Sequence, residues 1–208
     1  MTSAKIDTTS QPDEHLVGAL VHNLDTGFVA MFDTYRHVVF ATALRVSGRW
    51  ADAEDLTAEA FLRAYRALSG YRPDRIRALK PRQWLLTIVL NLWRNGERDS
   101  ARRPVLTSVE QAPDPPDPRP ATEQIVEERE SGRELAELLT VLPEEQRVAV
   151  VLRHVVNLPL PEIATVLGRP EGTVRSQISR GLRRLRELYP TGARLTCLVP
   201  AEPTEVGR

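Results

Sequence analysis

The chain has 208 residues with 28 basic and 28 acidic side chains, so any affinity for nucleic acid must come from charge gathered into local patches. A single cysteine, Cys197, excludes an internal disulfide and a cysteine-cluster metal site, which fits a reducing cytoplasm. The four histidines lack ligand spacing, and neither a nucleotide-binding glycine loop nor a Gly-x-Ser-x-Gly motif occurs, so we expect no catalytic residue, no metal and no cofactor.

The first 24 residues are polar and only weakly periodic, so residues 1–24 are predicted to form a polar N-terminal extension. They contain no apolar signal core, and the longest apolar stretches fall far short of the roughly 20 residues that a membrane span needs. We therefore expect a cytoplasmic protein without direct membrane insertion.

Three helical patterns follow, over residues 28–46, 51–68 and 80–99, and they predict a first helical domain over residues 25–103. Its last part interleaves basic and aromatic side chains, a pattern that suits unstacked bases of single-stranded nucleic acid. The contact candidates are Arg72, Arg75, Arg77, Lys80 and Arg82 in the loop, and Asn91, Arg94, Asn95 and Arg98 in the helix. Trp84 belongs to a good core stripe with Leu85 and Ile88, which favours a mainly structural role for it.

Prolines dominate the next segment, with six of them between residues 101 and 122. This composition cannot bury a core and favours extended chain, so residues 104–122 are predicted to be a flexible linker. At about 3.1 Å per residue, some twenty residues reach roughly 60 Å, close to two turns of B-DNA at about 34 Å each. One chain could therefore touch two separated DNA elements.

A second helical domain is predicted over residues 123–189, with the tail 190–208 disordered. Leu135, Leu138, Leu139 and Leu142 lead into a helix predicted to be buried through Val148, Val151, Leu152 and Val155. Residues 160–167 then predict a short helix that ends at Gly168. After the turn, Val174, Ile178, Leu182, Leu185 and Leu188 form one apolar stripe of a second helix.

These two helices and the turn have the pattern of a helix-turn-helix, whose second helix enters the major groove. Six arginines between residues 169 and 186 make its exposed face strongly positive, which suits phosphate. The alternative is an amphipathic helix with a solvated arginine face, and the preceding helix and glycine turn favour DNA binding over it. The candidates are Arg169, Glu171, Thr173, Arg175, Ser176, Gln177, Ser179, Arg180, Arg183 and Arg184.

Residues 52–65, 81–92 and 142–187 together resemble bacterial RNA polymerase sigma factors of the extracytoplasmic-function (ECF) group. The resemblance covers residues 28–103 and 123–188 in the family's order. It implies an all-α fold with two small helical domains, sigma region 2 and sigma region 4, joined by the Pro-rich linker. It also implies that the protein binds core RNA polymerase, directs it to promoter DNA, helps to open the duplex, and is controlled by an anti-sigma factor.

By this resemblance, the acidic and apolar helix of residues 52–65 docks on core polymerase, through Asp52, Glu54, Asp55, Leu56, Glu59 and Leu62. A mixed surface of this kind suits charge-steered docking, although an amphipathic core helix with acids near its N-terminus gives the same pattern. The loop and helix of residues 72–98 then bind the minus-ten element, and the helix-turn-helix binds the minus-thirty-five element. Ala58, Leu90 and Gln177 depart from the residues frequent in the family at these positions.

Two other interpretations remain open at the level of sequence. The first is a stand-alone helix-turn-helix repressor or activator, in which the first domain would bind a ligand or dimerise. The second is a sigma mimic that sequesters an anti-sigma factor. The basic and aromatic side chains of residues 70–103 argue against the mimic, and dependence on polymerase separates a sigma factor from a repressor.

Overall fold

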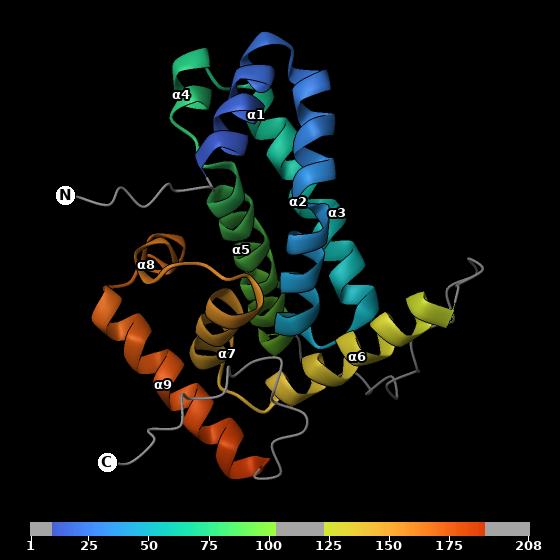
Figure 1. Ribbon diagram of the computed structural model, residues 1–208, viewed down its shortest axis with the longest axis vertical. Helices are drawn as coiled ribbons and strands as arrows, with labels where there is room; N and C mark the ends of the chain where they lie inside the picture. The colour runs from blue at the N-terminus through green and yellow to red at the C-terminus, as the bar shows by residue number, and fades with distance from the viewer. Residues whose placement is uncertain (1–9, 103–122, 190–208) are drawn as a thin grey trace, which may run out of the picture.

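The computed structural model describes residues 10–102 and 123–189, and all regular structure within them is helical, which confirms the predicted all-α fold (Figure 1). The elements are α1 (Ser10–His22), α2 (Leu24–Ser47), α3 (Trp50–Ser69), α4 (Pro73–Arg77), α5 (Pro81–Arg102), α6 (Glu123–Thr140), α7 (Glu144–Val150), the π-helical turn η1 (Val151–Val155), α8 (Leu160–Leu167) and α9 (Glu171–Leu188). The predicted linker, residues 104–122, and the tail, residues 190–208, lie outside the described residues. Within the described ranges, no helix is both long and apolar enough to cross a membrane.

Helix α1 lies in the segment that the sequence predicts to be a polar extension. Its residues Leu16, Val17 and Leu20 are buried against α2. Gly27 allows this close approach, since a Cβ there would lie 2.5 Å from the backbone nitrogen of Leu20. The first domain is therefore longer at its N-terminal side than the periodicity indicates.

Helices α2, α3 and α5 form the centre of the first half of the molecule. Small residues on α3, namely Ala53, Ala60 and Ala64, are fully buried and let the neighbouring helices approach closely. Tyr65 donates a hydrogen bond to Asp25 over 2.7 Å, tying α3 to the start of α2. The loop between α3 and α5 contains the short helix α4, whose residue Ile76 is buried and fixes the loop to the core.

The second half contains the predicted helix-turn-helix. Helix α8 ends at Gly168, which has the left-handed φ of 60° expected for a glycine that stops a helix. Helix α9 buries Val174, Ile178 and Leu185 as predicted, but Leu188 is 50 % exposed, because it lies at the last residue of the helix. The predicted helix after Pro143 is divided into α7 and the π-helical turn η1, which leaves Val155 only half-buried.

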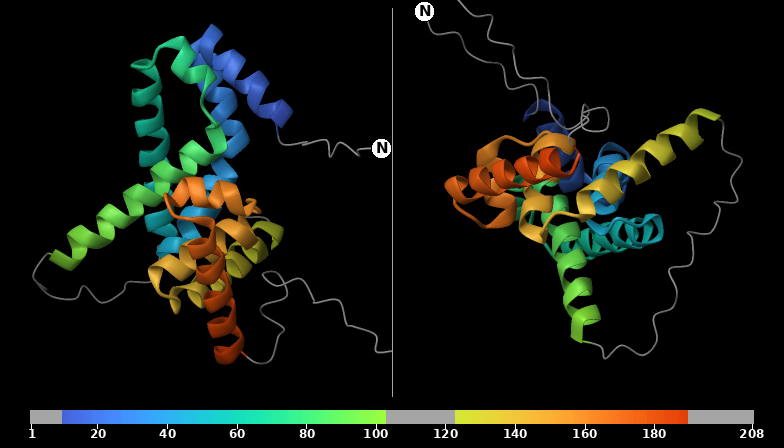
Figure 2. Two further views of the ribbon diagram at one scale, coloured as in Figure 1. Left: turned by 90° about the vertical axis from the view of Figure 1, so that its left-hand side faces the viewer. Right: turned by 90° about the horizontal axis from the view of Figure 1, so that it is seen from below.

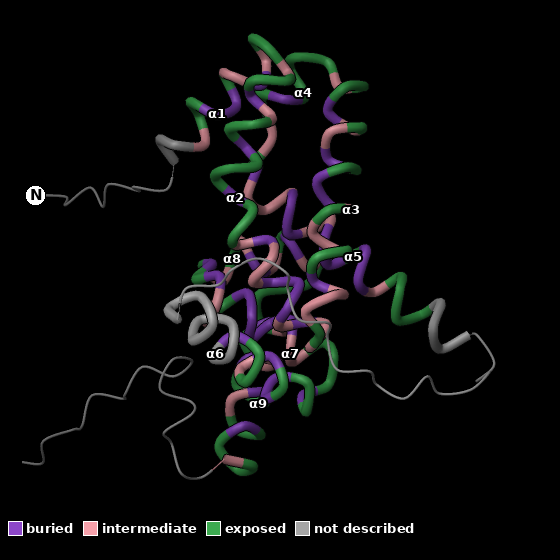
Figure 3. Tube along the Cα trace, turned by 90° about the vertical axis from the view of Figure 1, so that its right-hand side faces the viewer, coloured by how far each residue is buried: buried purple, intermediate pink, exposed green. Residues whose placement is uncertain are grey.

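The two halves pack against each other, with α6 against α2 and α8 against α5 (Figures 1 and 2). Buried residues of both halves belong to one continuous apolar core, which Figure 3 shows where the helices meet. Arg147 of α7 donates a hydrogen bond to the carbonyl oxygen of Val46 at the end of α2 over 2.7 Å. The periodicity of the sequence predicts the helices, but not this contact between the two halves.

Candidate functional site

An acidic groove lies between α3 and α5, with a cavity of about 560 Å³. Asp52, Asp55, Leu56 and Glu59 line it from α3, since residues at these spacings share one face of a helix. Leu92, Trp93, Gly96 and Glu97 line it from α5. Two other candidates on α3 do not line the cavity: Glu54 accepts a hydrogen bond from the Trp50 indole over 3.0 Å, and Leu62, which is 43 % exposed, follows Glu59 by three residues on the same face of the helix.

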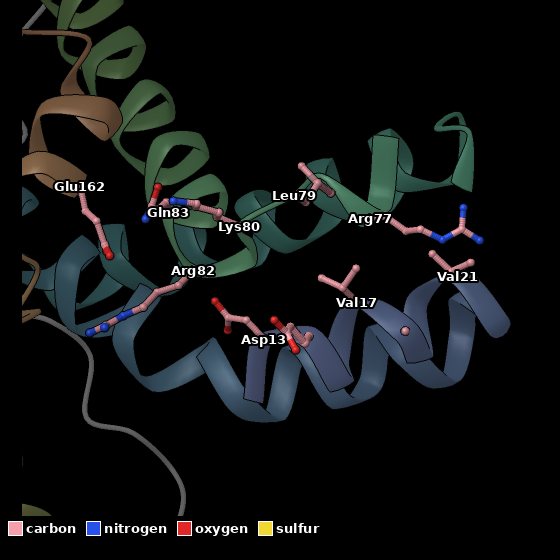
Figure 4. A pocket seen from close by; sticks show the side chains of 11 residues that line it. Asp13, Val17, Val21, Arg77, Leu79, Lys80, Arg82, Gln83 and Glu162 are labelled. Atoms are coloured by element: carbon pink, nitrogen blue, oxygen red, sulfur yellow. The ribbon is translucent and has the colours of Figure 1, made fainter. Parts of the chain in front are cut away.

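The basic residues around α4 face helix α1 across a cavity of about 640 Å³. Figure 4 shows Arg77, Lys80 and Arg82 on one side, with Asp13 of α1 and Glu162 of α8 also at the cavity. Arg82 donates a hydrogen bond to the carbonyl oxygen of Val156, which follows η1. Arg82 therefore already has a carbonyl partner and Arg77 forms an ion pair with Asp74 over 2.8 Å, whereas Lys80 is exposed at the cavity.

The two remaining loop arginines are exposed and differ in their partners. Arg75 lies over the Tyr71 ring, with its guanidinium carbon 3.7 Å from the ring centroid, while Arg72 is exposed at the start of α4. Tyr71 also packs against Trp84, with ring centroids 6.1 Å apart, and Trp84 is half-buried against the core. This environment agrees with the structural role that the sequence favours for Trp84.

The candidates on α5 form a second group, away from the loop. Arg98 lies sixteen residues after Arg82 in the same helix, which places it about 24 Å further along the axis at about 1.5 Å per residue. Asn91, Asn95 and Arg98 are exposed, whereas Arg94 is 22 % exposed and forms an ion pair with Glu144 of α7 over 2.9 Å. The C-terminal part of α5 projects from the body of the molecule (Figure 2).

Two candidates, one in the turn before α9 and one on α9, are held by one carboxylate of α7. Arg169 and Gln177 donate to Glu145 over 3.2 and 2.9 Å. Ser176 donates to the Thr173 carbonyl oxygen over 2.8 Å and accepts from Arg180 over 3.3 Å. The others are exposed: Glu171, Arg175, Ser179, Arg183 and Arg184, of which Arg183 lies 3.9 Å from Glu187.

The structure adds residues that the sequence pattern did not single out. Arg153 and His154 of η1 line a cavity of about 340 Å³ together with Arg175, Ser179 and Arg186 of α9. Among the described residues, no carboxylate lines it. Burial, with Arg153 and Arg186 nearby, lowers the pKa of His154. The adjacent Arg153 and His154 were the available signal, but they precede the helix-turn-helix in the sequence.

The chain was compared with known families and proteins. Residues 31–103 match the family described as Sigma-70 region 2, and residues 132–185 match Sigma-70, region 4. The ECF RNA polymerase sigma factor SigL of Mycobacterium tuberculosis is 31 % identical over 159 residues, which are 76 % of this chain and 85 % of that protein. This chain belongs to the ECF RNA polymerase sigma factors.

Other relatives are longer than the chain. The ECF RNA polymerase sigma factor SigE of Mycolicibacterium smegmatis is 39 % identical over 153 residues, covering 72 % of this chain and 56 % of the relative. For BldN of Streptomyces coelicolor the identity is 31 %, with 80 % of this chain and 62 % of the relative covered. The chain therefore spans less than two thirds of the length of these two relatives.

Two solved structures share the fold. CnrH in complex with the cytosolic domain of CnrY superposes with a TM-score of 0.63 at 24 % identity, covering 88 % of this chain and 99 % of that one. RpoE in complex with the anti-sigma factor NepR, from Bartonella quintana, has a TM-score of 0.60 at 21 % identity, covering 77 % and 94 % of the two chains. The predicted family and its two regions are thus confirmed, and sigma factors are transcription initiation factors.

Proposed function

We propose that this chain is a sigma factor that binds core RNA polymerase, directs it to specific promoters and helps to melt the duplex. The observation that carries the proposal is an acidic groove between α3 and α5 that is lined by none of the basic candidate residues of α5 and α9. One surface would hold polymerase while the others hold DNA. The chain would act in the cytoplasm, where polymerase and chromosome are, and would perform no covalent chemistry itself.

The α3 groove is the proposed contact with core polymerase. Its α3 carboxylates, Asp52, Asp55 and Glu59, lie beside the apolar side chains of Leu56 and Leu92, and Glu97 of α5 adds a fourth carboxylate. Such a groove suits a partner helix that carries both basic and apolar side chains, because charge steers the encounter and apolar burial stabilises the complex. Leu62, exposed on the same helix, would extend this contact.

The minus-ten element is proposed to lie along α5 and the α4 loop. Arg82 and Arg98 are about 24 Å apart along α5, which corresponds to about seven nucleotides at roughly 3.4 Å each. Arg75 over Tyr71 offers a cation and a ring face for an unstacked base. Contacts of this kind offset the cost of unpairing a base.

The minus-thirty-five element is proposed to be read as duplex by α9. Glu171 and Thr173 lie at its N-terminal end, where recognition helices contact base edges. Arg175 and Ser179 share a cationic groove with Arg153 and Arg186, and those two added arginines suit the phosphate backbone.

Control by an anti-sigma factor is also proposed. RpoE from Bartonella quintana shares the fold of this chain, and its solved structure is a complex with the anti-sigma factor NepR. For this chain, the α3 groove is open at the surface, with Leu56 half-buried at its wall and Leu62 exposed on the same helix, so such a partner can reach it. An anti-sigma factor that covers this groove would prevent polymerase from binding.

The polymerase contact is tested by reversing charge in the groove. The double variant Asp55→Lys/Glu59→Lys should weaken binding to core polymerase by about tenfold or more, since close charge pairs at interfaces couple by about 1.5 kcal/mol or more. Fluorescence anisotropy with labelled protein measures the affinity. The matched control is Glu134→Lys/Glu137→Lys, which makes the same charge change at exposed positions of α6. Equal losses in both variants would contradict the proposed groove.

A further inference from the structure

His154 is the only histidine of the described residues that is not exposed, and it lies in η1, just before the helix-turn-helix. It lines a cavity of about 340 Å³ between η1, α8 and α9. The other polar side chains around this cavity are those of Arg153, Arg175, Ser179 and Arg186, and the rest of its lining is apolar. The proposed minus-thirty-five contact draws on the arginines, so this histidine has no role in it.

Packing within the second half of the molecule holds this cavity in place. Helix α9 approaches α7 closely at Gly181, where a Cβ would lie 2.8 Å from a methyl group of Val150. Val150 directly precedes η1, so the same close packing sets η1 beside α9. Arg153 donates to the carbonyl oxygen of Leu158 over 3.0 Å, which ties its guanidinium group to the loop after η1. Every residue of the lining belongs to η1, α8 or α9, so no side chain of the first half forms part of the cavity.

The charged side chains that line the cavity beside His154 are all cationic. Arg153 is its neighbour in η1, Arg175 and Arg186 come from α9, and α8 contributes only Leu160. Helices α2 and α7 also pack against η1, but none of their residues lines the cavity. Among the described residues, no carboxylate lines it either. Burial, with Arg153 and Arg186 nearby, lowers the pKa of His154, so its ring is neutral at pH 7 in the free chain.

Three arginines in a cavity without a carboxylate form a site for anionic oxygens, and the phosphates of duplex DNA are the anions that the proposed function brings there. We infer that His154 is a phosphate contact that becomes charged only when DNA fills this cavity, so binding of the duplex takes up one proton from solvent. The inference rests on the proposed function, because it adds a contact to the same DNA-binding surface. A phosphate oxygen offers the imidazolium both the opposite charge and the hydrogen-bond acceptor that the cationic cavity lacks.

Proton uptake links the affinity for DNA to pH. Phosphates in the cavity raise the pKa of His154, whereas the free cavity holds it low. The affinity therefore rises as the pH falls from the pKa in the complex to the pKa in the free chain, by up to about tenfold per pH unit for one proton. The charged ring also adds one cation to the phosphate contacts, which steepens the slope of log affinity against log salt by about one unit.

Nuclear magnetic resonance of the histidine rings in the full chain measures this proton directly. The variant His154→Gln identifies the His154 signal, and the spectra are recorded between pH 5 and pH 8 at low salt, where phosphate contacts are strongest. The samples contain no DNA or a mixed-sequence duplex of about 30 base pairs, which is about three helical turns. The pKa of His154 should lie below about 6.5 in the free chain and rise by about one unit or more with the duplex. The controls in the same sample are the exposed histidines of α1 and α2, whose pKa should not change: His15, His22 and His37.

The affinity for the same duplex, measured by fluorescence anisotropy, gives the second test. Wild type should bind about three- to tenfold more tightly at pH 6 than at pH 7.5, and His154→Gln should lose most of this difference. The matched control His37→Gln, at an exposed position of α2, should keep it. The variant His154→Lys, which is charged at both pH values, should bind tightly at both. Circular dichroism checks the fold, and glutamine variants of the other three histidines assign the signal by elimination if His154→Gln does not fold.

The two tests separate the proton-linked contact from the proposed function. A pKa of His154 that the bound duplex leaves unchanged overturns the contact, even where the chain supports polymerase-dependent transcription. Equal pH dependence in wild type and His154→Gln, or no binding of the duplex at low salt, overturns it as well. A pKa that rises with the duplex, in a chain that never supports transcription, retains the contact and overturns the proposed function.

Discussion

The arginines of α9 differ in their surroundings although they share one helix. Arg175 is exposed and lies in a groove with Arg153 and Arg186, where like charges gather without a carboxylate among the described residues. Arg180 instead donates to Ser176, while Arg169, in the turn before α9, is held by Glu145. Arg175 can therefore donate to a phosphate without giving up a hydrogen bond to another protein group.

We predict that Arg175→Ala weakens promoter binding by the polymerase complex and reduces the salt dependence of binding. Loss of one phosphate contact lowers the slope of log affinity against log salt by about one unit. Binding measured at several salt concentrations gives this slope. Arg66→Ala, an exposed arginine on α3 outside the proposed sites, is the control. An unchanged slope for Arg175→Ala would show that this side chain makes no phosphate contact.

We predict that the stability of the fold depends on pH through His154. Burial beside Arg153 and Arg186 lowers its pKa in the folded chain, so the unfolded chain, with a histidine pKa of about 6.5, binds the proton more readily. Stability should therefore fall as the pH drops below about 6.5, and His154→Gln should remove part of this fall. Urea unfolding of the wild-type chain and of His154→Gln between pH 5 and pH 7.5 measures this loss of stability. Parallel curves over that range would rule out the contribution of His154.

Two things bring the site residues together. One is helical spacing, which the sequence displays, and the other is packing between helices, which it does not display. Asp52, Asp55 and Glu59 were predicted as polymerase contacts together with Glu54, and their helical spacing places these three on one face of α3. The pairing of Arg94 with Glu144 joins residues fifty positions apart, and no periodicity indicates it. The cationic groove of Arg153 escaped prediction for the same reason, since it forms only when η1 packs beside α9.

At the scale of elements, glycines decide how closely the helices approach. Gly27 of α2 lies against the backbone of Leu20, so an added methyl group there would meet atoms that cannot rotate away. Gly18 of α1 has open space around its missing Cβ. The two positions lie on neighbouring helices and differ mainly in this contact.

We predict opposite effects of alanine at these glycines. Gly27→Ala should destabilise the fold by about 1–3 kcal/mol, because overpacking pushes α1 from α2. Gly18→Ala should stabilise it by about 0.5–1 kcal/mol through the better helix propensity of alanine. Denaturant midpoints of both variants measure the change. A Gly27→Ala protein as stable as Gly18→Ala would mean that α1 does not pack on α2 in this way.

The sequence predicts some elements well because their signals are local. Gly168 ends α8, and the stripe of Val174, Ile178 and Leu185 faces the core, as the spacing indicates. Helix α1 was not predicted because its apolar residues lie among many polar ones. They are buried only because α1 packs against α2. The π-helical turn η1 shifts the helical phase after Val150, and a uniform period of 3.6 residues cannot anticipate that shift.

At the scale of the whole molecule, one core joins regions that the sequence shows as two domains. Each region has its own helical pattern, so periodicity alone makes them look independent. The contacts between them combine buried apolar residues with polar links such as Arg147 to Val46.

The central claim, that this chain is a sigma factor, is tested most directly by run-off transcription from fragmented genomic DNA with purified core polymerase. Reactions contain no added protein, the wild-type chain, or the variant Arg175→Ala/Arg180→Ala. New transcripts with defined start sites should require the wild-type chain and decline with the variant. A chain that binds DNA tightly without polymerase and yields no transcript on any template would contradict the claim and favour a stand-alone helix-turn-helix repressor.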